Sequence, residues 1–231
     1  PSPDETAMRY GIDSDGEPIA RVFKTMHAAH TGKLSIARLW RGELEEGANV
    51  NGMRIGGLST LLGNQQKKLA KVGLGDVVAL SRMDEVSTGD LLTVSGTPPE
   101  GVAAWSDPAQ PVFSMAIFAV NRADEVKLTG ALQRLNEEDP SLTYHQDRDT
   151  MQLVLRGQGD IHLQIALDKL KNRYNIEARI ERPRVPYKET IRKTVSQHAR
   201  FKRQTGGHGM FGDVHIEIKP LPRGTGFEFT N

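Results

Sequence analysis

The spacing of hydrophobic and polar positions divides the chain into stretches with different periods. Between residues 18 and 107, short runs of alternating apolar and polar residues are separated by turns that contain glycine. In one of these runs, Leu34 and Ile36 fall on one face of an extended strand, whereas Ala37 and Leu39 fall on the other. The strand-like runs of this stretch are 20–26, 33–42, 76–83 and 90–94. Strands at intervals of roughly 8–12 residues with glycine turns predict a small β-barrel or sandwich.

From residue 108 the pattern alternates between strand and helix periods. Two stretches with helical spacing of their apolar residues lie among extended runs at 112–118, 141–147, 151–157 and 176–180. We expect the first helix to be capped by Asp124 and ended by Pro140, and the second to be capped by Asp160. The order β-α-β-β-α-β is that of the split βαβ sandwich, so a ferredoxin-like domain is predicted.

The two ends of the chain differ from these middle stretches. Residues 1–17 are polar and are expected to be a linker or a partial end, and residues from 184 onward return to strand-like alternation. We therefore expect a multidomain α+β chain, interpreted as a fragment of a longer protein. Its predicted parts are a linker at 1–17, a β-barrel at 18–107, a ferredoxin-like domain at 108–183 and the truncated start of an α/β domain at 184–231.

Composition narrows the class of protein. Of the 231 residues, 37% are hydrophobic and 26% are charged, and no apolar run approaches the roughly 20 residues that a membrane-spanning helix needs. The sequence contains no cysteine, which rules out disulfides and thiolate metal sites and fits a reducing compartment. A cytoplasmic protein without a membrane partner is expected.

The distribution of charge is more informative than its total of +1. Between Lys169 and Arg203 the sequence has twelve lysines and arginines but only three glutamates, which gives a local net charge of +9. Such asymmetry favours a polyanionic partner, with nucleic acid first, although a solvated charged face is the alternative.

A glycine-rich segment, KRQTGGHGMFGDV, follows this basic region at residues 202–214. Backbone amides in a glycine loop can approach a nucleic-acid backbone closely, and neighbouring cations neutralise phosphates. The alternative is a flexible β-hairpin tip with a charged base. The candidate RNA-contact residues are Arg200, Lys202, Arg203, Gly206, Gly207, His208 and Gly209.

Patterns typical of catalysis or metal binding are weak. The histidines show no spacing typical of a metal site, no phosphate-binding P-loop sequence occurs, and neighbouring acids such as Glu137, Glu138 and Asp139 fit a solvent-exposed helix end. We therefore predict no catalytic residue and no metal site. Gly157 and Gly159 favour a tight strand-to-helix turn over an anion site, and a structural role is the commoner one for a residue such as His162.

Several segments resemble translation elongation factor G. The segment 202–214 is similar to KRQSGGRGQYGHV at the start of the family's fourth domain, and 157–191 is similar to its third-domain signature, which includes Gly157, Gly159 and His162. RLNEEDPSL at 134–142 and the glycine turns of the first stretch add to a resemblance over residues 18–231. The family's usual loop arginine and tyrosine are His208 and Phe211 here, and Ala48 stands where aspartate is usual, which is more similar to elongation factor G-like paralogues.

The resemblance implies a function for the longer protein. It implies a ribosome-dependent GTPase in which GTP and Mg²⁺ belong to a GTPase domain outside this chain, so that the chain alone has no cofactor and no enzymatic activity. The implied partners are the ribosome, with ribosomal RNA and the tRNA–mRNA complex, and the GTPase domain of the same parent chain. Alternatives are a ribosomal-protection or other translational GTPase paralogue, and a free-standing RNA-binding module.

Overall fold

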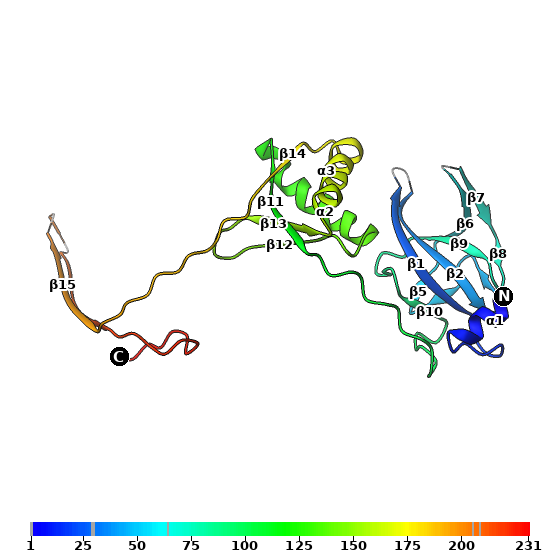
Figure 1. Cartoon of the computed structure of the whole chain (residues 1–231), viewed down its shortest axis with the longest axis horizontal. Helices are drawn as coiled ribbons and strands as arrows, with labels where there is room; N and C mark the ends of the chain where they lie inside the picture. The colour runs from blue at the N-terminus through cyan, green and yellow to red at the C-terminus, as the bar shows by residue number, and fades with distance from the viewer. Residues whose placement is uncertain (1, 29–30, 64, 205, 208) are drawn as a thin grey trace. The chain divides into compact units, whose positions relative to one another are not determined.

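The computed structural model describes residues 2–28, 31–63, 65–204, 206–207 and 209–231. The chain forms two compact units, Pro1–Arg184 and Val185–Asn231, and each is described by itself. Figure 1 shows the elements of both units in chain order.

The first unit begins with a short helix in the segment expected to be a linker. Helix α1 (Pro3–Arg9) has Ser2 as its N-cap, and Ser2 and Glu5 bond each other's backbone amides in a capping box. Ala7 on this helix and Ile12 after it are buried together with Ile19, which begins the first strand. Residues 1–17 are mostly polar, but Ala7 and Ile12 pack against Ile19 and so attach this segment to the first strand.

The stretch expected to be a β-barrel forms three antiparallel sheets. The largest has the strand order β10-β1-β2-β9-β6-β7, and the two smaller ones pair β3 with β8 and β4 with β5. Because all three sheets contribute side chains to one core, the strands enclose a single apolar interior. The strands are β1 (Ile19–Ala28), β2 (Gly32–Arg41), β3 (Leu44–Glu45), β4 (Asn49–Val50), β5 (Met53–Arg54), β6 (Gly57–Leu62), β7 (Gln65–Leu69), β8 (Lys71–Val72), β9 (Val77–Ser81) and β10 (Leu91–Thr93).

Strand β2 is buried on both faces, which simple alternation does not predict. Ala37 and Leu39 belong to the main core, as one face of the pattern suggests. Leu34 and Ile36 on the other face form a second apolar cluster with Ala79 of β9. The sheet is therefore covered on both sides near this strand.

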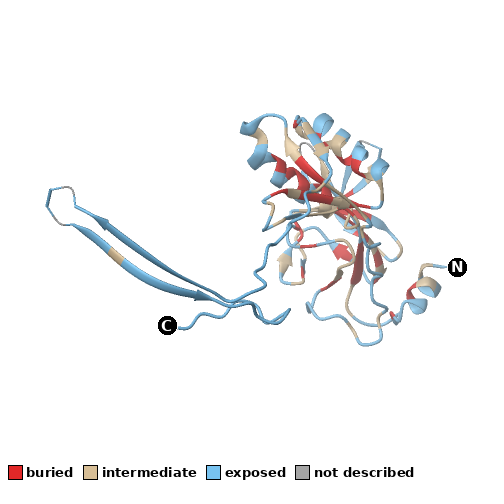
Figure 2. Ribbon diagram, turned by 60° about the vertical axis from the view of Figure 1, so that its left-hand side comes forward, coloured by how far each residue is buried: buried red, intermediate tan, exposed pale blue. Residues whose placement is uncertain are grey.

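The second half of this unit confirms the predicted ferredoxin-like order. The strand order β12-β13-β11-β14 is antiparallel at each pairing, and α2 and α3 pack on the sheet around a core that includes Leu132, Leu155 and Leu163. Figure 2 shows buried residues concentrated in these sheets and on the inner faces of the helices. The elements are β11 (Phe113–Ala119), the 3₁₀ helix η1 (Arg122–Asp124), α2 (Glu125–Glu138), β12 (Thr143–Gln146), β13 (Leu153–Gly157), α3 (Asp160–Tyr174) and β14 (Ala178–Glu181).

The two expected helix caps are wrong in detail. Asp124 holds the N-cap position of α2, but its side chain makes no cap hydrogen bond and instead accepts from Lys127 at 2.8 Å. In α3 the N-cap residue is Gly159, so Asp160 is the first helical residue rather than the cap. An acidic residue in the first turn of each helix still places a negative charge beside the positive end of the helix dipole, which is stabilising.

The second unit is built on one long β-hairpin. Strands β15 (Val195–Arg203) and β16 (Met210–Ile218) pair antiparallel over their whole length, from Val195 opposite Ile218 to Arg203 opposite Met210. Figure 2 shows both strands exposed almost throughout. Among the described residues, no helix is long and apolar enough to cross a membrane.

Candidate nucleic-acid interface

The hairpin presents two chemically different faces. On one face Val195, Ala199 and Phe201 of β15 lie beside Val214 and Ile218 of β16. The other face carries mainly polar and charged side chains of both strands, together with Phe211 near the loop, whereas Gln197 and Arg203 fall on the apolar face. The polar face has the polar and charged members Ser196, His198, Arg200, Lys202, Asp213, His215 and Glu217. The polar face is therefore available for a charged partner along the whole length of the hairpin.

The three predicted cations lie in the half of β15 nearest the loop. Lys202 lies opposite Phe211 and Arg203 lies opposite Met210, and these are the last two residue pairs of the strands before the loop. The Arg200 guanidinium lies 5.3 Å from the centre of the Phe211 ring, and its Nε atom is 3.8 Å from Asp213 Oδ2. All three cations are exposed, so they can reach phosphate groups without losing a buried partner.

The loop glycines have open surroundings. Gly206 and Gly207 have φ angles of +56° and +101°, a region that glycine enters freely and other residues enter at a cost. A Cβ atom added at either glycine would meet nothing within 4 Å. Glycine is therefore favoured here by the positive φ angle and not by a lack of space for a side chain. At Gly209 a Cβ would lie 3.6 Å from the Arg203 carbonyl oxygen. His208 lies outside the described residues.

The glycines and histidine of the third-domain signature form a separate structural junction in the first unit. The Gln158 amide donates to His162 Nδ1 at 3.1 Å, which leaves the proton on Nε2, and Nε2 lies 3.1 Å from Asp139 Oδ2. A Cβ at Gly157 would be 2.9 Å from His162 Nδ1, so only glycine fits there without displacement. His162 therefore ties the strand-to-helix turn after β13 to the end of α2.

A set of contacts between two domains of the first unit was not predicted from the sequence. The β-sheet domain contains strands β1 to β10, and the α+β domain contains strands β11 to β14 with helices α2 and α3. Glu138 accepts from Arg173 Nη1 at 2.7 Å, from Arg173 Nη2 at 2.8 Å and from the His27 amide at 2.8 Å. Glu137 accepts from His27 Nε2 at 2.8 Å and lies 3.3 Å from Lys33 Nζ. We call these five side chains the domain joint.

The expectation that Glu137, Glu138 and Asp139 form a solvent-exposed helix end is therefore wrong. The Glu138 side chain is only 10% exposed, because β1 lies against the end of α2. Burial by itself raises the pKa of Glu138, but hydrogen bonds from Arg173 and the His27 amide outweigh burial and lower the pKa. The pKa of Asp139 is likewise lowered, since bonds from Ser141 outweigh its burial. No sequence signal links residue 27 to residue 138, because strand and helix meet only in the folded chain.

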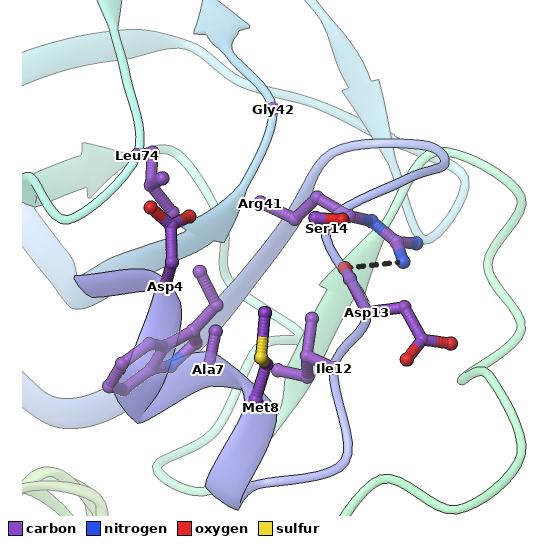
Figure 3. Close-up of a pocket in the computed structure, with 10 residues that line it drawn as sticks. Asp4, Ala7, Met8, Ile12, Asp13, Ser14, Arg41, Gly42 and Leu74 are labelled. Carbon is purple, nitrogen blue, oxygen red and sulfur yellow. Dashed lines mark hydrogen bonds between the residues drawn. The ribbon is translucent and has the colours of Figure 1, made fainter. Parts of the chain in front are cut away.

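Two cavities lie beside α1. The smaller, of about 30 Å³, lies between α1 and the end of β2, where Arg41 donates to the backbone oxygen of Asp13 (Figure 3). Arg41 also donates to the backbone oxygen of Asp15. The size of this cavity suits a single water molecule, so a structural role explains it.

The larger cavity, of about 380 Å³, is lined by both tryptophans of the chain, Trp40 and Trp105, and by Arg21 and Arg38. Arg21 donates to the Ala103 oxygen at 2.7 Å, and burial lowers its pKa. The two tryptophans therefore report on this side of the β-sheet domain.

Comparisons with known proteins identify the three parts of the chain. Residues 18–95 match a family model described as elongation factor G domain 2, residues 109–182 match elongation factor G domain III, and residues 183–231 match elongation factor G domain IV. The chain belongs to the elongation factor G family. The predicted resemblance is thus confirmed, together with its mixed α+β fold class.

Two relatives place the chain within this family. An elongation factor G-like protein of Synechocystis sp. is 45% identical over the whole chain, which covers 34% of that protein. A crystal structure of a protein from Thermus thermophilus is 33% identical with a TM-score of 0.77, over 95% of this chain and 33% of its own. The chain thus spans about a third of the length of each of these relatives.

Proposed function

We propose that the chain is the middle part of a ribosome-dependent translational GTPase of the elongation factor G type. In this proposal its residues contact RNA during movement of the tRNA–mRNA complex. The exposed hairpin β15–β16 carries the proposal, because it brings Arg200, Lys202 and Arg203 to the base of a glycine loop. A narrow loop with few side chains can enter a confined RNA site, and the cations behind it supply phosphate contacts.

The proposal assigns GTP and Mg²⁺ to a GTPase domain of the parent protein, outside this chain. The residues described above act as contacts and as structural supports. In the parent, the domain joint holds the β-sheet domain against the α+β domain. The His27 backbone provides its best-paired link, because its amide donates to Glu138 at 2.8 Å and its carbonyl oxygen accepts from Arg173 at 2.6 Å.

The test of this proposal is GTP hydrolysis by the intact parent protein with and without ribosomes. We expect ribosomes to increase the rate by orders of magnitude, since the motor is proposed to be triggered by docking. Equal rates under the two conditions would contradict the proposal, whatever the affinity of the fragment for RNA.

A charge variant of the hairpin tests the RNA contact directly. We expect the double substitution Lys202→Gln and Arg203→Gln to weaken ribosome binding of the parent and to reduce the slope of log affinity against log salt by about 1.4–1.8, or 0.7–0.9 for each phosphate that the hairpin no longer neutralises. The matched control is Lys127→Gln with Lys171→Gln, two lysines whose side chains are each 68% exposed on α2 and α3. An equal reduction of slope in both variants would indicate a general charge effect and refute a contact at the hairpin.

The elongation factor G-like name of the Synechocystis relative favours a second candidate. In this candidate the parent uses the same docking surfaces for a task other than translocation. Ribosome-stimulated GTP hydrolysis without any movement of mRNA would identify that case.

A further inference from the structure

The polar face of the hairpin contains three potential metal ligands, which we call the hairpin histidine cluster: His198, Asp213 and His215. The strand register places His198 directly opposite His215. Asp213 precedes His215 by two residues on β16, so its side chain emerges on the same face. The two histidines are 17 positions apart in the sequence, and only the antiparallel pairing brings them together.

The potential ligand atoms of the cluster lie near one another. One imidazole nitrogen from each histidine and one carboxylate oxygen of Asp213 all lie within 4.8 Å of one another. The two rings are stacked, with centroids 3.9 Å apart and an interplanar angle of 5°. His198 Nε2 contacts Asp213 Oδ1, and His215 Nε2 lies 4.0 Å from the same oxygen. The three donor atoms are therefore close together, although the planes of the two stacked rings do not yet meet at one point.

Rotation of the two imidazole rings out of their stack would complete the site. Zinc–ligand bonds of about 2.0–2.2 Å in a tetrahedral arrangement place the ligands roughly 3.3 Å apart. The three side chains are partly or largely exposed, so their rotation can bring the ligand atoms closer together. The exposed fractions are 48% for His198, 78% for His215 and 34% for Asp213. Asp213 Oδ2 faces Arg200, which leaves Oδ1 directed at the histidines in the way that outer hydrogen-bond partners orient metal ligands.

The donor set selects the class of metal. Two imidazoles and one carboxylate suit Zn²⁺ with a water molecule in the fourth position, whereas Mg²⁺ prefers an all-oxygen octahedron. The nearby Arg200 charge opposes a dication, but this guanidinium also lies over the Phe211 ring and can remain there.

We propose that the hairpin histidine cluster binds one Zn²⁺ ion. The bound ion joins β15 to β16 midway along the hairpin and fixes the strand register that positions the glycine loop. This inference goes beyond the proposed function and does not depend on it, because zinc binding is a property of the hairpin alone.

Calorimetric titration of ZnCl₂ into the chain of residues 1–231 tests the proposal. We expect saturable binding of one ion, with affinity lowered at least about tenfold in His198→Ala and in His215→Ala, because even the loss of an outer-shell partner has an effect of that size. Asp213→Asn keeps the side-chain shape and should also weaken binding. The matched control, His145→Ala, removes another exposed histidine on β12 and should leave the isotherm unchanged. MgCl₂ should give no saturable signal.

Hydrogen exchange provides a second measurement. Zn²⁺ should slow amide exchange of β15 and β16 in the unsubstituted chain and in His145→Ala, but not in His215→Ala, because the ion links the two strands. Absence of saturable binding at millimolar Zn²⁺ would overturn the proposal. Binding that persists unchanged in both histidine variants would also overturn the proposal, since the ion would then be bound by other residues, such as the remaining five of the seven histidines.

Discussion

The substitution Glu138→Gln tests whether the domain joint stabilises the first unit. The Glu138 carboxylate accepts three hydrogen bonds, two from Arg173 at 2.7 and 2.8 Å and one from the His27 amide at 2.8 Å. Glutamine keeps one acceptor oxygen but removes the charge and directs an amide NH₂ group at the guanidinium. Arg173 then remains without its anionic partner at a partly buried position.

The expected loss of stability follows from the burial of the two side chains. Breaking a fully buried ion pair by removing one partner costs about 3–5 kcal/mol. Glu138 is 10% exposed, but Arg173 is 37% exposed, so water can solvate the abandoned guanidinium and reduces this cost. We therefore expect a loss of about 2 kcal/mol in the free energy of unfolding, or roughly 4–8 °C in Tm for a unit of this size.

Urea denaturation followed by two probes provides the assay. Tryptophan fluorescence reports on the β-sheet domain, which Trp40 and Trp105 flank, and circular dichroism at 222 nm reports mainly on α2 and α3. If the joint couples the domains, the two curves coincide in the unsubstituted chain, and in Glu138→Gln both shift or the curves separate. The control Glu177→Gln removes an exposed pair with Lys171 at 3.8 Å and should cost no more than about 1 kcal/mol. A Glu138→Gln loss no larger than that of the control would refute the reasoning.

Three further predictions concern pH and two glycines. Because the folded-state pKa of Glu138 is lowered, the stability it contributes is present above its ordinary pKa of 4.5 and is lost as the pH falls through the lower folded value. The urea midpoint should therefore fall on acidification below pH 4.5, and less steeply in Glu138→Gln. Gly157→Ala places a methyl group 2.9 Å from His162 Nδ1 and should destabilise the first unit by about 1–3 kcal/mol, measured by the same urea titration. Gly207→Ala should leave that unit unchanged but strain the loop by about 1–2 kcal/mol, since φ there is +101°, and should reduce ribosome binding by the parent in a filter assay.

The sequence predicted the elements whose cause is local. Apolar periodicity and turn residues predicted the β-α-β-β-α-β order, because the spacing of apolar residues and a helix-ending residue such as Pro140 affect only a few neighbouring residues. The helix caps were less predictable: Asp124 forms a salt bridge with Lys127 instead of capping α2, and the choice between these partners depends on side-chain geometry. The short helix α1 was not predicted, although Ser2 and Glu5 form the pattern of a capping box with Pro3 at the first helical position. Only the burial of Ala7 depends on contacts with distant residues.

The candidate site was predictable only in part. The basic residues and glycines of the hairpin stand together in the sequence, so their composition could reveal them. The domain joint and the hairpin histidine cluster could not be found in this way. His27 meets Glu138 across more than a hundred residues, and His198 meets His215 only through the strand register. Contacts of this kind follow from tertiary pairing, which hydrophobic periodicity does not encode.

Single-turnover movement of mRNA on pretranslocation ribosomes, driven by the intact parent protein with GTP, tests the central claim most directly. The account predicts rapid movement by the parent and slower movement by its Lys202→Gln and Arg203→Gln variant, with the Lys127→Gln and Lys171→Gln control close to the parent. Movement at the same rate in the hairpin variant, or none with the parent itself, would contradict a role of this hairpin in translocation.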